Sequence, residues 1–149
     1  MIDIEKNYQA LQSRIQSSLA LTGQEESGFT IVAVSKKKSL AEIETAYRLG
    51  LSHFGENYVQ EAVKKIKSFH HKATWHFIGS IQSNKVKPIA ENFDWVHTIT
   101  RYSIAEKLDK HRPKSLPPLH VCVQIQLHQD DSRNCLPINQ LFAMATKIK

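Results

Sequence analysis

One lysine stands where an α/β protein places reactive groups. Lys36 follows the apolar run Ile31–Val34, which has the pattern of a buried strand. In α/β folds, ligands and reacting groups gather at the carboxyl ends of the strands. A lysine there becomes a nucleophile when desolvation or a neighbouring cation favours its neutral amine, which can then form an imine with a carbonyl group. The alternative is a solvated basic loop, because Lys37 and Lys38 follow directly.

Polar side chains accompany the next two strand-like segments as well. Asn57 follows the second segment, His76 lies within the third, and Ser83 and Asn84 belong to the polar turn after it. If the strands are parallel neighbours, these groups meet at one rim, where a helix N-terminus favours an anion. Gly55 permits close backbone approach there. The alternatives are that Asn57 and Ser83 are ordinary helix caps and that His76 is a satisfied core histidine.

Several other chemistries lack their sequence motifs. The eight histidines include no HExxH or similar pair, so we expect no metal site. GxSxG, Walker and GxGxxG motifs are absent too. Cys122 and Cys135 are not part of a CxxC pair, which predicts free thiols rather than a zinc site or a disulfide framework. All five glycines lie at or before Gly79, so the residues after it contain no glycine-rich phosphate loop.

Hydrophobic periodicity predicts alternating helices and strands after an N-terminal amphipathic helix over residues 3–20. Ser39–Glu42 has the capping-box pattern of a helix start, and Gly50 suits the end of that helix. We expect strands over residues 29–34, 51–54, 74–78, 94–98 and 119–127, and helices over 39–49 and 59–66, from 83, and over 103–110 and 136–148.

The regular spacing of these strands indicates the architecture. Their starts are separated by 22, 23, 20 and 25 residues, so one βα unit repeats five times. This favours a parallel α/β fold, with residues 1–149 as a single domain. An open doubly wound sheet and a (β/α)₈ barrel both fit the pattern. A barrel takes about 250 residues, whereas only five strands are counted here.

Composition bounds the class of protein. The chain has 149 residues, a formal charge of +6, 41% hydrophobic residues and 23% charged residues, which is ordinary globular usage. The lysines are dispersed and no nucleic-acid-binding module is evident, so an anionic small ligand or a solvated surface accounts for the charge. No apolar run approaches the roughly 20 residues of a membrane span, and the N-terminus is acidic. We expect a cytoplasmic protein without membrane or nucleic-acid contacts.

Three separated motifs, in order along the chain, give a specific resemblance. They are Val32-Ala33-Val34-Ser35-Lys36, the segment from Phe54-Gly55-Glu56-Asn57 to Glu61, and Trp75-His76-Phe77-Ile78-Gly79 with Gln82-Ser83-Asn84-Lys85. With these motifs the chain resembles the YggS/PROSC family of pyridoxal phosphate (PLP) homeostasis proteins. The resemblance implies an incomplete (β/α)₈ barrel similar to the N-terminal domain of alanine racemase, with about five βα units after an N-terminal helix.

The same resemblance implies a function. Pyridoxal 5′-phosphate would be held as a Schiff base on Lys36, with Asn57, His76, Ser83 and Asn84 as further PLP-binding residues. Members of the family are not known to turn over a substrate; they are thought to hand PLP to PLP-requiring apoenzymes in vitamin B6 homeostasis. We therefore expect a carrier rather than an enzyme.

The resemblance also implies a longer chain, whose later strands carry the serine- and glycine-rich loops that bind the PLP phosphate. In this chain Cys135 stands where the family has a glycine. Two alternatives stay open: a racemase-like PLP enzyme, which needs a second acid or base opposite Lys36, and a remnant that binds no cofactor. An open five-stranded sheet exposes its edges and one apolar face, so we expect self-association or a complementing chain.

Overall fold

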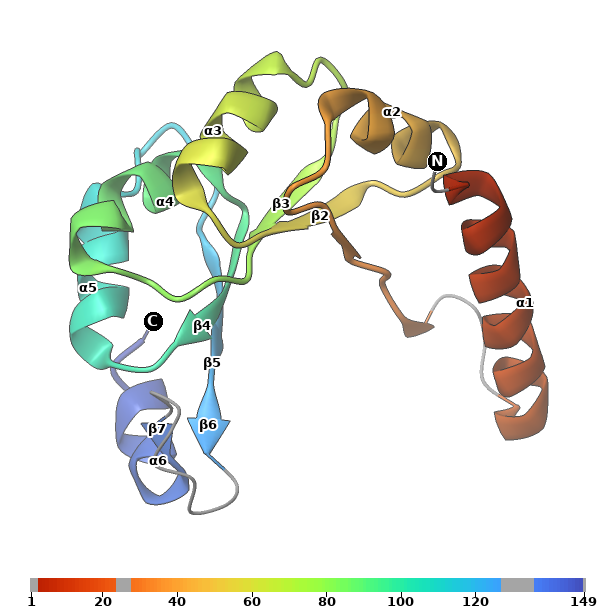
Figure 1. Ribbon diagram of the computed structural model, residues 1–149. Helices are drawn as coiled ribbons and strands as arrows, with labels where there is room; N and C mark the ends of the chain where they lie inside the picture. The colour runs from red at the N-terminus through yellow and green to blue at the C-terminus, as the bar shows by residue number, and fades with distance from the viewer. Residues whose placement is uncertain (1–2, 24–27, 127–135, 149) are drawn as a thin grey trace.

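The strand order of the sheet identifies the architecture. The computed structural model describes residues 3–23, 28–126 and 136–148. Five parallel strands lie in the order β1-β2-β3-β4-β5, which is also their order in the chain (Figure 1). A doubly wound sheet reverses its strand order at a switch point, whereas a (β/α)₈ barrel adds each strand beside the last. The strand order therefore identifies the sheet as part of a barrel rather than a doubly wound sheet. The strands are β1 (Ala33–Val34), β2 (His53–Glu56), β3 (Thr74–Phe77), β4 (Trp95–Ile99) and β5 (His120–Val123).

Helices form an outer layer on one side of this curved sheet (Figure 1). They are α1 (Ile4–Thr22), α2 (Leu40–Arg48), α3 (Val59–Ser68), the 3₁₀ helix η2 (Ser83–Lys85), α4 (Val86–Asn92), α5 (Tyr102–His111) and α6 (Ile138–Ala145). The predicted alternation of helix and strand is confirmed. The core lies between α2–α5 and the helix-facing side of the sheet, where Phe54, Phe77, Val96 and Ile99 pack with Ile43, Ala62, Ile89 and Leu108.

The capping box predicted before α2 is present. The Ser39 hydroxyl accepts from the Glu42 N–H at 3.3 Å, and Oε2 of Glu42 accepts from the Ser39 N–H at 2.8 Å. The backbone and side-chain hydrogen bonds from Ser39 lower the pKa of Glu42 to about 2, with a further contribution from Lys38. Gly50 follows the helix with φ of 99°, a left-handed conformation that glycine adopts at little cost. Sequence signals thus predicted both ends of the helix after Lys36.

The first strand departs from its prediction. Residues 29–34 have the pattern of a strand buried on both faces, but only Ala33–Val34 pair with a neighbour. Val34 is 52% exposed and Phe29 is 41% exposed. β1 lies at the edge of the sheet and pairs only with β2 among the described strands, so its apolar side chains have little to pack against.

A separate two-stranded sheet precedes the last helix. Leu136–Pro137 (β7) pairs in parallel with Ile125–Gln126 (β6), which continues the direction of β5. The prediction of one helix over residues 136–148 was therefore wrong at its start, since α6 begins at Ile138. Two residues that include a proline leave no periodic signal.

Other expectations concern thiols and membranes. Cys122 is a free thiol, whereas Cys135 lies outside the described residues. None of the helices in the described ranges has the length and apolarity needed to cross a membrane.

Candidate functional site

Lys36 lies at the carboxyl end of β1, in a tight turn. The Lys38 N–H donates to the Ser35 carbonyl oxygen at 3.0 Å, and Lys37 has φ of 60°. A positive φ at the third residue is the pattern of a type II turn, where glycine or asparagine is usual. The left-handed conformation costs a lysine about 1–2 kcal/mol. The turn leaves Lys36 exposed.

A buried ionic cluster lies directly beneath this turn. Glu56, at the end of β2, is fully buried and accepts from the Ser35 hydroxyl at 2.6 Å and from the Lys65 ammonium at 2.8 Å. Lys65 projects from α3 and is only 9% exposed. Its Nζ also donates to the Ser35 carbonyl oxygen at 2.7 Å. The strand that ends in Lys36 is thereby tied to the second strand and to the helix that follows it.

Glu61 completes the cluster on its solvent side. Its Oε1 accepts from Lys65 Nζ at 2.6 Å and from the Lys37 backbone N–H at 2.7 Å. The hydrogen bond from Lys65 lowers the pKa of Glu61 most, and the Lys37 N–H lowers it further, against the opposing effect of burial. Glu61 is therefore an anion over the ordinary working range of pH.

Asn57 follows β2 on the same edge of the sheet. Its Oδ1 is buried and has no hydrogen-bond partner among the described residues. The capping role considered for it is wrong, because Tyr58 is the N-cap of α3 and makes no side-chain cap. The backbone of Asn57 passes so close to Gly79 that a Cβ on Gly79 would collide with it. The close backbone approach expected at Gly55 is thus found at Gly79. A Cβ on Gly55 would meet a side chain instead, 3.1 Å from Ile78.

Ser83 and Asn84 begin η2, after the third strand. Both are exposed, and Gln82 rather than Ser83 is the N-cap, without a side-chain hydrogen bond. They follow β3 as Lys36 follows β1 and Asn57 follows β2. The fold therefore puts these four residues at the carboxyl edge of three neighbouring parallel strands.

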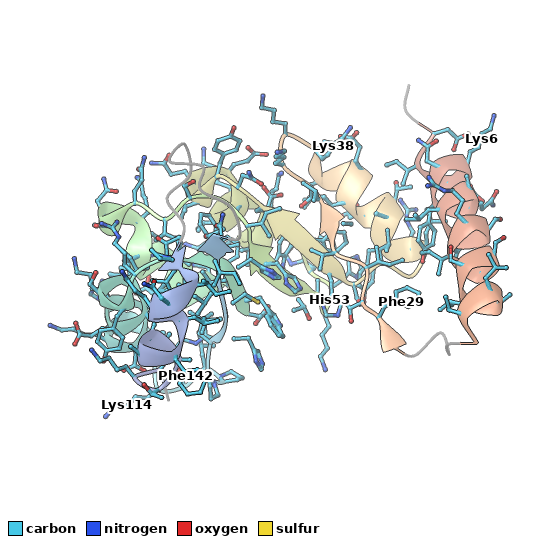
Figure 2. All side chains as sticks on the ribbon, turned by 90° about the horizontal axis from the view of Figure 1, so that it is seen from below. Lys6, Phe29, Lys38, His53, Lys114 and Phe142 are labelled. Atoms are coloured by element: carbon cyan, nitrogen blue, oxygen red, sulfur yellow. The ribbon has the colours of Figure 1, made fainter. Side chains whose placement is uncertain are left out.

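His76 is the penultimate residue of β3, level with Gly55 of β2, and belongs to a row of histidines across the sheet. Its Nε2 lies 2.9 Å from Nδ1 of His53 on β2, and its Nδ1 lies 2.9 Å from Nε2 of His97 on β4. Figure 2 shows the neighbouring His53 at the opposite end of the strands from Lys38. Both ring nitrogens of His76 thus face other histidines, and the side chain is buried.

The histidine row belongs to the face of the sheet opposite the core. Strand alternation places His53, His76 and His97 on that face, and Trp95 stacks on His76 with 5.8 Å between ring centroids. Burial lowers the pKa of His76 to about 4, with smaller contributions from the charges of His97 and His53. Burial also lowers the pKa of His97. His76 and His97 are therefore neutral near pH 7.

Sequence inspection did not identify the cluster beneath Lys36. Glu56 and Glu61 occur in the second motif without an assigned role, and Lys65 was not considered. A glutamate inside a short strand and an i,i+4 Glu61–Lys65 pair on the next helix are the available signals. Neither reveals that the two converge on the Lys36 turn. No group of three His, Cys, Asp or Glu side chains within the described ranges is arranged to hold a metal ion.

Comparison with known proteins places this geometry in a family. The family model described as alanine racemase, N-terminal domain, matches residues 3–149. The chain belongs to this family. A pyridoxal phosphate homeostasis protein of Pasteurella multocida is 42% identical over 98% of this chain, and that of Escherichia coli K12 is 40% identical over 99%. The chain spans 64% and 65% of the lengths of these two relatives.

Solved structures agree with the family assignment. PipY of Synechococcus elongatus, solved without PLP, matches with a TM-score of 0.76 and 32% identity over 89% of this chain and 63% of PipY. The same protein with PLP bound matches with a TM-score of 0.74 and 33% identity, over 89% of this chain and 62% of PipY. The fold is thus part of the (β/α)₈ barrel of the alanine racemase N-terminal domain type, as the sequence predicts.

Proposed function

We propose that this chain binds pyridoxal 5′-phosphate through Lys36 and serves in PLP homeostasis. The observation that carries the proposal is the position of Lys36, an exposed amine on a backbone turn tied to the sheet and to α3. The names of the relatives and the PLP-bound structure of PipY support the choice of cofactor. We propose further that residues 1–149 act as one cofactor-binding domain.

The residues at the rim fit such a cofactor in part. PLP supplies an aldehyde, which condenses with a lysine amine to form a Schiff base with loss of one water. Lys36 provides the amine, and Asn57 provides a buried Oδ1 without a hydrogen-bond partner among the described residues, so a polar group of a ligand can satisfy it. Ser83 and Asn84 provide exposed donors at the same edge.

His76 contributes differently from the other four candidates. Because both of its ring nitrogens lie 2.9 Å from other histidines, we propose that it supports the rim from within the sheet rather than donating to the cofactor.

Retention of the cofactor is expected to be weak. No glycine occurs after Gly79, so the residues beyond it offer no glycine-rich loop for a phosphate. A charge-assisted hydrogen bond to the phosphate is worth about 1.5–3 kcal/mol, so a site made from residues 1–149 that lacks two or three of them binds PLP roughly two to six powers of ten more weakly. We expect PLP to be lost on dialysis.

Borohydride trapping tests the site. The protein is incubated with PLP and reduced, and its peptides are analysed by mass spectrometry. We expect the pyridoxyl adduct on Lys36 above the other fourteen lysines. Lys36→Ala should abolish this selective labelling, whereas Lys114→Ala, at an exposed position in a loop, should not. Adducts spread evenly over surface lysines would contradict the proposal and favour a remnant without a cofactor site.

We propose that the protein is a carrier rather than an enzyme. The homeostasis names of the relatives support this choice over a racemase-like activity, which is the second candidate because of the family to which the chain belongs. PLP-loaded protein is incubated with a panel of amino acids, and the products are followed by chiral chromatography. We expect no turnover. Turnover that disappears in Lys36→Ala would establish the enzyme instead.

The setting and partners follow from the carrier role. We propose that the protein acts in the cytoplasm and that PLP-requiring apoenzymes receive its cofactor. Mixing PLP-loaded protein with an apoenzyme that lacks activity without PLP tests the transfer. We expect activity to return faster than with the same concentration of free PLP, and equal rates would contradict the transfer.

A further inference from the structure

The backbone on both sides of Lys36 is held by one helix. The Ser35 carbonyl oxygen, which precedes Lys36, accepts from Lys65 Nζ at 2.7 Å. The Lys37 N–H, which follows Lys36, donates to Glu61 Oε1 at 2.7 Å. Lys65 and Glu61 are joined to each other at 2.6 Å on α3. A single i,i+4 ion pair therefore fixes both peptide groups that flank Lys36.

The Lys36 turn needs such support because its own sequence disfavours it. A type II turn takes glycine or asparagine at its third residue, where this chain has Lys37 with φ of 60°. The Glu61 carboxylate accepts the N–H of this strained residue in a short hydrogen bond, which favours this orientation of the peptide over the alternatives. Without Glu61, the turn is free to relax to conformations with negative φ.

The ammonium of Lys65 uses all three of its N–H donors in this cluster. Its three donors meet three acceptors: the Ser35 carbonyl oxygen, Glu56 Oε1 and Glu61 Oε1. Buried ion pairs add little stability compared with well-packed apolar residues of the same volume, so a gain in stability is a weak reason for this cluster. Its hydrogen bonds instead hold one turn, the turn that carries Lys36.

We propose that Glu61 is a positioning residue for Lys36: through the Lys37 N–H and through Lys65, it holds the turn that directs the Lys36 amine to the cofactor. This inference rests on the proposed binding of PLP at Lys36. Glu61 acts on the backbone, and its negative charge is needed only to hold Lys65 and accept the Lys37 N–H.

The test uses three variants and two measurements. Glu61→Ala removes both contacts, Glu61→Gln keeps an acceptor for the Lys37 N–H, and the double variant Glu61→Ala/Lys37→Gly restores the turn through the conformational freedom of glycine. The matched control is Glu91→Ala, which removes the exposed i,i+4 partner of Lys87 on α4. The first measurement is amide hydrogen exchange at residue 37 without PLP, and the second is the ratio of borohydride-trapped pyridoxyl adduct on Lys36 to that on Lys38.

We expect Glu61→Ala to accelerate exchange at the Lys37 amide and lower the Lys36-to-Lys38 adduct ratio, each about tenfold. Glu61→Gln and the control should stay within about threefold of the parent. The double variant should recover most of the adduct ratio. Circular dichroism of each variant verifies that it is folded.

Two outcomes would overturn the inference. One is a folded Glu61→Ala variant with unchanged exchange and an unchanged adduct ratio. The other is a low adduct ratio in both Glu61→Gln and the double variant, which would assign the effect to the charge of Glu61 rather than to the turn. Failure of the proposed function is distinguishable from both, because the parent protein would then show no preference for Lys36 while its Lys37 amide stayed protected.

Discussion

Nδ1 of His53 and Nε2 of His76 lie 2.9 Å apart, so two histidines on neighbouring parallel strands share one hydrogen bond. Through its other ring nitrogen, His76 makes the same contact with His97. In a neutral imidazole one nitrogen donates and the other accepts, so neutral His76 donates to one neighbour and accepts from the other. Protonation of His76 would give it two N–H donors, and one neighbour would have to change its tautomer or turn away.

This relationship predicts a pH-dependent stability. The pKa of His76 is about 4 in the folded chain against 6.5 for a free histidine, so the unfolded chain binds more protons between these values. The free energy of unfolding should therefore fall as the pH drops from about 6.5 to about 4, by at most about 1.4 kcal/mol per pH unit from this residue. Urea unfolding at a series of pH values measures this slope.

Variants assign the slope to the histidine row. His76→Phe should flatten it, leaving the smaller contribution of His97, whereas His70→Gln at an exposed position should leave it unchanged. The pKa of Glu42 is about 2 in the folded chain against 4.5 for a free glutamate, so Glu42 contributes to the pH dependence of stability only at lower pH. An equally steep slope in His76→Phe would refute the assignment.

The capping box before α2 gives a second prediction, on stability alone. Ser39→Ala removes the acceptor for the Glu42 N–H and should lower the free energy of unfolding by about 1 kcal/mol, or a few degrees in Tm. Ser13→Ala is the matched control, because the Ser13 hydroxyl only donates to the Gln9 carbonyl within α1. We expect that control to be neutral or slightly stabilising. A loss in the control equal to that of Ser39→Ala would argue against a capping effect.

Local signals predicted the elements but not their surroundings. The capping pattern at Ser39 and the glycine at Gly50 marked α2, since both act within a few residues. Burial of the run before Lys36 was predicted wrongly, because its apolar pattern does not record whether a neighbour covers Val34. The choice between a barrel and a doubly wound sheet likewise depended on strand order, which periodicity does not encode.

Only the site residues that directly follow a strand could be predicted from the sequence. Lys36 and Asn57 were identified because each follows an apolar segment, and the fold brings such positions to one edge. Lys65 was missed because a lysine on an amphipathic helix is normally solvated, and only the tertiary contact with Glu56 buries it. The hydrogen bonds of His76 to His53 and His97 could not be predicted either, because they join three strands that lie far apart in the sequence.

Exposed apolar side chains around β1 predict self-association. Phe29 and Leu11 line a groove of about 420 Å³ beside α1, and Val34 is 52% exposed on the edge strand. Such a patch on a strand with one neighbour among the described strands favours contact with another chain. Light scattering at micromolar concentration should show a dimer or a larger species.

Charge substitutions locate the association surface. Phe29→Lys combined with Val34→Lys should shift the protein toward the monomer. Leu21→Lys should not, because Leu21 is 87% exposed and does not line the groove beside α1. A compact monomer of the unmodified chain at these concentrations would contradict the prediction.

The close approach of Gly79 to Asn57 predicts two variants with different outcomes. A Cβ on Gly79 would collide with the Asn57 backbone, whose carbonyl carbon and Cα would each lie 2.9 Å away. Because Gly79 is buried and its carbonyl accepts from Thr98 at 2.6 Å, the third strand has little room to shift. Gly79→Ala should therefore lower the free energy of unfolding by about 1–3 kcal/mol and reduce pyridoxyl labelling of Lys36.

Asn57→Ala should reduce labelling with little loss of stability, since its Oδ1 has no partner within the described residues.

Urea unfolding and borohydride trapping on the same preparations separate the two effects. Gly28→Ala is the control, because a Cβ at Gly28 meets nothing within 4 Å. If Asn57→Ala destabilised the chain as much as Gly79→Ala while Lys36 labelling stayed at the parent level, Asn57 would be a packing residue of the rim rather than a contact for the cofactor.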